Sequence, residues 1–136
     1  MTHPTLEQTS THGQCEAEFL HTFTALAALL RPYTGELLVR VDNDHHLYLD
    51  CPTEVRPGYP RFLGAVAVMK SSVSFHFMPV YTNPELLLSL SAALRSRMQG
   101  KSCFTFRTID TEQIEELRRL VQRGIALYRE HGLVPA

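Results

Sequence analysis

The sequence predicts an α+β domain built on an antiparallel β-sheet of about five strands, with helices packed mainly on one face. Apolar residues repeat at helical spacing near both ends of the chain and alternate with period two in between. Short turns join successive strands as hairpins. Strands joined in this way cannot form a doubly wound parallel sheet, because parallel neighbours need long crossover connections. The expected order of elements is therefore α-β-β-β-β-α-β-α.

Length and composition are typical of one soluble domain. The 136 residues are 44% hydrophobic and 20% charged, with a formal net charge of −1. A chain of this size buries enough surface to fold without a disulfide or a cofactor, and we expect none. Its three cysteines form no CxxC pair, which favours a reducing compartment and a cytoplasmic protein. The first apolar run is too short to span a bilayer, so no membrane association is expected.

A disordered tail over residues 1–14 is expected to precede a single domain over residues 15–136. The tail is rich in Thr, His, Gln and Ser and offers little apolar surface to offset the entropy of ordering. From Cys15 to Pro32 the spacing of apolar residues predicts a helix with one buried face. The residues on that face are Phe19, Phe23, Leu26 and Leu30.

A first hairpin is predicted after this helix. Residues 37–41 and 47–51 alternate in polarity on either side of a turn at Asn43-Asp44. A long irregular loop is expected from Pro52 to Arg61, since three prolines and a glycine in this stretch disfavour both helix and β-ladder.

A second hairpin is predicted to pair residues 62–70 with residues 73–81 through a turn at Ser71-Ser72. Its first strand is apolar on both faces, which is typical of a central strand.

A helix, a short strand and a last helix complete the predicted fold. The first of these helices opens after Asn83, a plausible N-cap, and ends at Gly100. The strand covers residues 102–107. The last helix begins near Asp110-Thr111 and stops at Gly132.

The string Gly100-Lys101-Ser102 matches the end of a phosphate-binding P-loop, but the context excludes that motif. The first glycine of the motif would stand at position 95, which is Arg95. The predicted order is also helix then strand, whereas a P-loop needs strand then helix.

The favoured functional hypothesis is a non-enzymatic module that binds a small ligand or a protein partner in a groove beside the sheet. Donors and a thiol fall on adjacent predicted elements, where a helix ends and a strand begins. The candidate ligand-binding residues are His76, Tyr81, Lys101, Cys103 and Arg107. Nucleic acid is an unlikely partner at this net charge, and a homodimer would form if the last strand lay at an open sheet edge.

Two alternatives remain open. The first is metal binding of an iron type by acids and a histidine of the first hairpin: Asp42, Asp44, His46 and Asp50. Period-two geometry collects too few ligands on either face of that hairpin, so a neighbouring strand would have to complete the site. The second is a small cysteine-dependent enzyme, in which the basic flanks of Cys103 lower its pKa and His76 is the base.

Three stretches carry a family resemblance: FLGAVAVMK at 62–70, VSFHFMPVY at 73–81 and RMQGKSCFTF at 97–106. With their layout from about Leu37 to Arg129, the chain resembles the YdhG-like family of uncharacterised bacterial domains, which is sometimes grouped with frataxin-like proteins. The resemblance implies an intracellular α+β module of unassigned activity. The frataxin analogy implies iron handling by an acidic surface, for which Asp42, Asp44 and Asp50 are the nearest equivalents.

Overall fold

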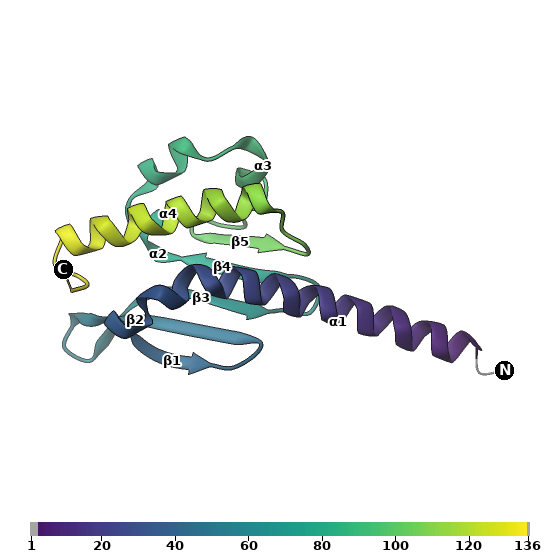
Figure 1. The fold of residues 1–136 in the computed structure, drawn as a ribbon. Coiled ribbons are helices and arrows are strands. Elements are labelled where there is room, and N and C mark those ends of the chain that lie inside the picture. The colour runs from purple at the N-terminus through teal and green to yellow at the C-terminus, as the bar shows by residue number, and fades with distance from the viewer. Residues whose placement is uncertain (1–2, 136) are drawn as a thin grey trace.

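The computed structural model describes the backbone of residues 3–135 and the side chains of residues 16–135 (Figure 1). Five antiparallel strands lie side by side in chain order. They are β1 (Leu38–Asp42), β2 (His46–Arg56), β3 (Tyr59–Val68), β4 (Val73–Phe77) and β5 (Cys103–Phe106). The predicted fold class and the predicted order of elements are confirmed.

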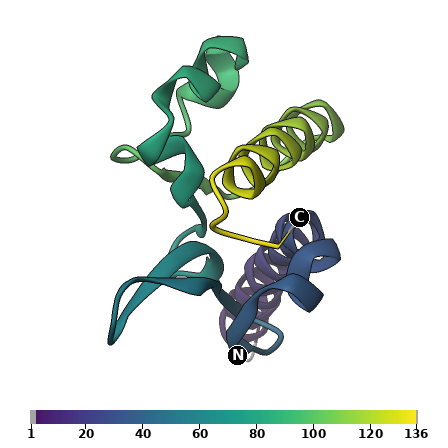
Figure 2. The ribbon, with the colours of Figure 1, turned by 90° about the vertical axis from the view of Figure 1, so that its left-hand side faces the viewer.

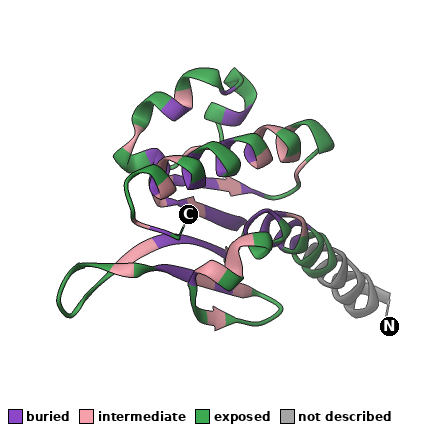
Figure 3. Cartoon of the chain, turned by 60° about the vertical axis from the view of Figure 1, so that its left-hand side comes forward, coloured by how far each residue is buried: buried purple, intermediate pink, exposed green. Residues whose placement is uncertain are grey.

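Two long helices cover one face of the sheet, α1 (His3–Leu30) and α4 (Thr111–Glu130). They lie next to each other over the strands (Figure 2). The strand side chains beneath them are almost completely buried (Figure 3). Phe75 is at the centre of this layer, because its Cα partners are Val66 on one side and Phe104 on the other. The opposite face of the sheet carries no helix among the described residues.

The predicted tail over residues 1–14 falls on residues whose side chains lie outside the described part of the chain. It stays a prediction, although the backbone of α1 already begins at His3. Within the described residues, no helix has the length and apolar character needed to cross a membrane.

The loop predicted from Pro52 to Arg61 is wrong. β2 continues to Arg56 and β3 begins at Tyr59, so the two strands form a hairpin with a short turn at Pro57-Gly58. Gly58 has a φ of 84°, a conformation that glycine adopts without a steric penalty. The pairing shifts register on both sides of Glu54. Such bulges break the ladder locally, and prolines are tolerated within a strand at these places.

The second hairpin closes at its predicted turn, where Met69 N–H donates to the carbonyl of Ser72 at 2.7 Å. Its return strand is shorter than predicted, because β4 ends at Phe77 and residues 78–82 form the helix α2 (Met78–Thr82). Pro79 lies in the first turn of α2, where its missing N–H is not needed by the helix.

The single helix predicted between Asn83 and Gly100 is also wrong. The chain forms a 3₁₀ helix, η2 (Pro84–Ser89), and then a single α-helical turn, α3 (Ala92–Arg95). Leu90 separates them in an extended conformation. Asn83 does not cap η2 with its side chain, since its amide donates instead to the carbonyl of Pro79 at 3.2 Å.

The last strand and the last helix are confirmed. Asp110 caps α4 by accepting from Gln113 N–H at 2.7 Å, in a reciprocal capping box. β5 lies at a sheet edge, but its outer side is already hydrogen-bonded: Thr105 N–H donates to Arg97 and Gln99 N–H donates to Cys103, both at 2.8 Å. The edge on which the homodimer prediction rested is therefore covered by the chain itself.

Candidate functional site

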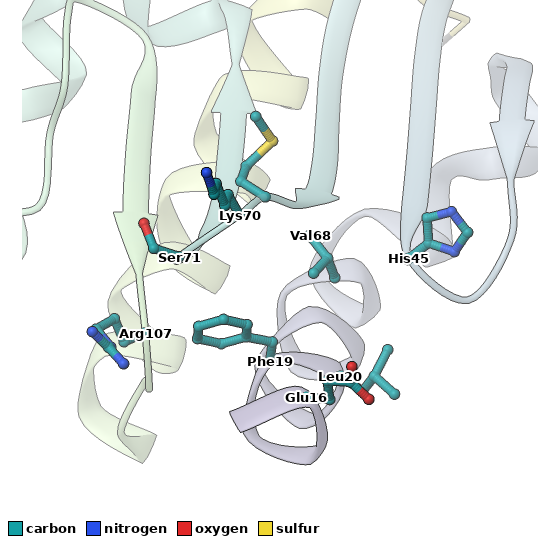
Figure 4. A pocket seen from close by; sticks show the side chains of 9 residues that line it. Glu16, Phe19, Leu20, His45, Val68, Lys70, Ser71 and Arg107 are labelled. Carbon is teal, nitrogen blue, oxygen red and sulfur yellow. The ribbon is translucent and has the colours of Figure 1, made fainter. Parts of the chain in front are cut away.

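A groove of about 660 Å³ opens where helix α1 meets one end of the sheet (Figure 4). We call it the α1 groove. This volume is within the usual range for small-molecule sites. Nine residues line it: Glu16, Phe19, Leu20, His45, Val68, Met69, Lys70, Ser71 and Arg107. They come from α1, the β1–β2 turn, the end of β3, the β3–β4 turn and the segment after β5.

The apolar surface of the α1 groove comes from α1 and the end of β3. Phe19 faces inward and is buried, whereas its neighbour Leu20 is 43% exposed. Val68 is the last residue of β3 and its N–H donates to the carbonyl of His45 at 2.9 Å, which joins the two turns. Met69 follows and is 54% exposed. Two large apolar side chains thus remain open to solvent beside the groove.

Arg107 is held against α1 by two contacts. Its guanidinium carbon lies 5.9 Å from the ring centroid of Phe19, a cation–π distance. Its carbonyl accepts a hydrogen bond at 3.1 Å from the hydroxyl of the buried Thr22. The side chain of Arg107 itself is exposed and lines the groove. The first residue after β5 is therefore fixed at the mouth of the groove.

The polar residues of the α1 groove are unevenly distributed along it. Lys70, Ser71 and Arg107 lie on the side of the groove to which the ring of Phe19 points, whereas Glu16 lies beside Leu20 on α1 and His45 lies across Val68 from them (Figure 4). None of the ion pairs between described residues includes Lys70 or Arg107. One end of the groove is therefore cationic.

The five predicted ligand-binding residues do not converge. His76 and Cys103 are Cα partners on neighbouring strands and share the face of the sheet away from the helices. Lys101 lies with Tyr81, its Nζ 6.0 Å from the ring centroid. Arg107 alone lines the α1 groove.

His76 lines a separate, shallow depression of about 370 Å³ on the face of the sheet without helices. Aromatic rings surround it, with centroids 4.9 Å apart for Tyr48 and Phe62 and 6.3 Å apart for Phe62 and His76. Burial lowers the pKa of His76. Met69 lines both this depression and the α1 groove, so the two hollows are neighbours.

Cys103 does not have the environment of an activated nucleophile. Its burial raises the pKa of the thiol, with a smaller opposing effect from a hydrogen bond to the backbone of Phe75. The thiol lies 3.7 Å from the carbonyl oxygen of Phe104 and donates to it. The shift is opposite to the one that the cysteine-enzyme alternative requires.

The four candidate metal ligands are also kept apart. Each carboxylate has its own partner, at 3.0 Å between Arg31 and Asp42, 2.9 Å between His45 and Asp44, and 2.8 Å between Arg40 and Asp50. His46 instead lines the aromatic depression. Among the side chains that the structure describes, no three His, Cys, Asp or Glu residues lie close enough to share a metal ion.

Most of the α1 groove was missed at the level of sequence. Phe19, Leu20 and Val68 were recognised only as apolar residues of a helix and a strand. One usable signal was present, because Leu20 stands beside the buried stripe of α1 rather than on it. Another was the apolar Met69 directly before the exposed turn residues Lys70 and Ser71.

No protein-family model matches the chain, and no curated protein and no solved structure shows a significant similarity to it. The resemblance to YdhG-like domains accordingly stays a prediction.

Proposed function

We propose that the chain is a non-enzymatic binding module that holds a small molecule with an apolar body in the α1 groove. The observation that carries this proposal is the pair of exposed apolar side chains, Leu20 and Met69, that flank a groove of about 660 Å³ next to Val68. Apolar side chains that converge on a concave site are the usual wall of a small-molecule pocket.

The polar residues of the α1 groove support binding rather than catalysis. Nucleophilic catalysis needs a nucleophile and a base within hydrogen-bond reach of each other. Ser71 and His45 lie at opposite ends of the groove (Figure 4), and the Nδ1 atom of His45 is 2.9 Å from Asp44. The hydroxyl of Ser71 and the imidazole of His45 are therefore not arranged to act as nucleophile and base.

The compartment is part of the same proposal. Cys51 and Cys103 are free thiols, as expected for a protein of a reducing compartment such as the cytoplasm. The ligand would then be a cytoplasmic metabolite with an alkyl or comparable apolar body.

A methyl-selective NMR titration tests the proposal. Octan-1-ol is added to the labelled full chain, and the methyl signals of Leu20, Val68 and Met69 are expected to shift most. Leu20→Glu places a charge beside the apolar wall, and we expect it to weaken binding about ten-fold or more, because burying alkyl groups next to a carboxylate loses the hydrophobic gain.

Leu88→Glu is the matched control, since Leu88 is 77% exposed on η2 and is not among the residues that line the groove. It should bind the alcohol as the unaltered chain does. Equal binding by both variants, or shifts confined to methyl groups outside the groove, would show that the proposed site is wrong.

A further inference from the structure

We infer that the ligand of the α1 groove is a carboxylic acid with an alkyl chain, whose single carboxylate binds between Lys70, Ser71 and Arg107. This inference rests on the proposed function, because it assigns the head group of a ligand whose apolar body lies in the same groove.

Arg107 is the main element of the head-group site. A guanidinium presents a planar pair of N–H donors that matches the two oxygens of a carboxylate. The hydrogen bond from Thr22 fixes the backbone of Arg107, and the contact with the ring of Phe19 holds its guanidinium against α1. Such pre-organisation lowers the entropy lost when the ligand binds.

The charges of the groove set the direction in which the ligand lies. Lys70 adds a second cation to the lining of the same groove, and Ser71, which Figure 4 shows between Lys70 and Arg107, adds a hydroxyl donor. Glu16 lies beside Leu20 on α1 (Figure 4), and its carboxylate disfavours an anion at that place. The alkyl chain then extends from Arg107 past Val68 toward Leu20. The apolar wall and the cationic end are therefore used by one amphipathic molecule.

A carboxylate fits this site better than a phosphate. Phosphate sites commonly use the free N–H groups at the start of a long helix. The helix that follows Arg107 is α4, and Asp110 already accepts from the N–H of Gln113 in its first turn.

Calorimetric titrations of the full chain with four ligands that each contain eight carbons test the head group. The ligands are octanoate, octan-1-ol, octylammonium and octyl phosphate. We expect octanoate to bind about ten-fold more tightly than octan-1-ol, because hydrogen bonds to charged groups exceed neutral ones by about that factor. Each methylene added to the carboxylate while the groove still has room should tighten binding about four-fold.

Substitutions show which residues cause the preference for octanoate over octan-1-ol. Arg107→Gln should remove most of the preference for octanoate over octan-1-ol, and Arg107→Lys should keep part of the preference. Lys70→Gln should reduce it as well, and this exposed turn residue provides a second test if Arg107→Gln does not fold. Arg97→Gln removes an exposed arginine that does not line the groove and should have no effect.

The failures of the two proposals are distinguishable. If octanoate and octan-1-ol bind equally, or if the preference survives both Arg107→Gln and Lys70→Gln, the head-group inference is wrong while the groove remains a binding site. Tighter binding of octylammonium or octyl phosphate also overturns it. If none of the four ligands binds, or if Leu20→Glu leaves their binding unchanged, the proposed function itself is wrong.

Discussion

The hydroxyl of Thr22 donates to the carbonyl of Arg107 at 3.1 Å and joins two residues that are 85 positions apart in the chain. Thr22 is 1% exposed and lies on the face of α1 that meets the sheet. This contact ties the segment after β5 to the helix that forms one wall of the groove. The fold and the candidate site are thus linked through one buried side chain.

Thr22→Val is expected to destabilise the protein by about 1–2 kcal/mol, because the buried hydroxyl and its partly buried hydrogen bond are lost while the side-chain volume is kept. Thr22→Ser retains the hydroxyl and should cost less than Thr22→Val. The free energies of unfolding are compared by urea titration. If Val proved as stable as Thr, the hydrogen bond would not contribute to holding Arg107.

Gly124→Ala is expected to destabilise the fold by about 1–2 kcal/mol, although alanine favours a helix more than glycine does. A Cβ at this position of α4 would lie 2.5 Å from Cε2 of Phe77 and 2.9 Å from Cβ of Pro79. Phe77 is fully buried, so its ring has no space into which to move. Thermal unfolding monitored by circular dichroism measures the effect.

Gly35→Ala is the matched control for this prediction. Nothing lies within 4 Å of a Cβ at position 35, and its φ is not positive. Its melting temperature should equal that of the unaltered chain within a few degrees. A Gly124→Ala variant that is as stable as this control would contradict the close packing of α4 against Phe77 and Pro79.

Cys51 and Cys103 are expected to react with iodoacetamide more slowly than a free cysteine peptide at neutral pH. Burial raises the pKa of Cys51 to about 11 and also raises the pKa of Cys103, so both are thiols rather than thiolates. Peptide mass spectrometry over a time course measures each site separately. Faster alkylation of Cys103 than of the free peptide would restore the cysteine-enzyme alternative.

The protein should lose stability as the pH falls below about 6.5, in part because of His76. Burial lowers the pKa of His76 from its ordinary value of 6.5. Between the lowered value and 6.5 the unfolded chain binds this proton more readily than the folded chain, so acid favours unfolding. In His76→Gln the fall in stability between pH 7 and pH 5 should be shallower. An equally steep fall would mean that His76 is not protonated more easily in the unfolded chain.

The sequence predicted those parts of the fold that depend on local patterns. The cap of α4 was recognisable from Asp110, and the turn at Asn43-Asp44 was recognisable from its residue types. Both features depend only on residues that are close together in the sequence. The stretch from Pro52 to Arg61 was misjudged, since Pro57 lies in the turn while Pro52 and Pro60 stand where the pairing is irregular, which only the partner strand reveals. The residue pattern within one strand does not show where a β-bulge forms in its pairing with the next strand.

The candidate site was less predictable because it is assembled from distant segments. Arg107 was identified among the ligand-binding candidates, but its partners in the groove come from α1 and from the β3–β4 turn. His76 and Cys103 lie on neighbouring strands and share a sheet face, whereas Arg107 lies beyond the paired residues of β5. Which turn meets which helix depends on the packing of α1 across the sheet, and no local sequence pattern encodes it.

The most direct test of the central claim is a set of intermolecular NOEs between octanoate and the full chain. The account predicts NOEs from the terminal methyl of the ligand to the methyl groups of Leu20 and Val68, and from the methylene next to the carboxylate to the side chain of Arg107. NOEs only to Ala65 and Ala67, on the opposite face of the sheet, would place the ligand in the aromatic depression and contradict the account.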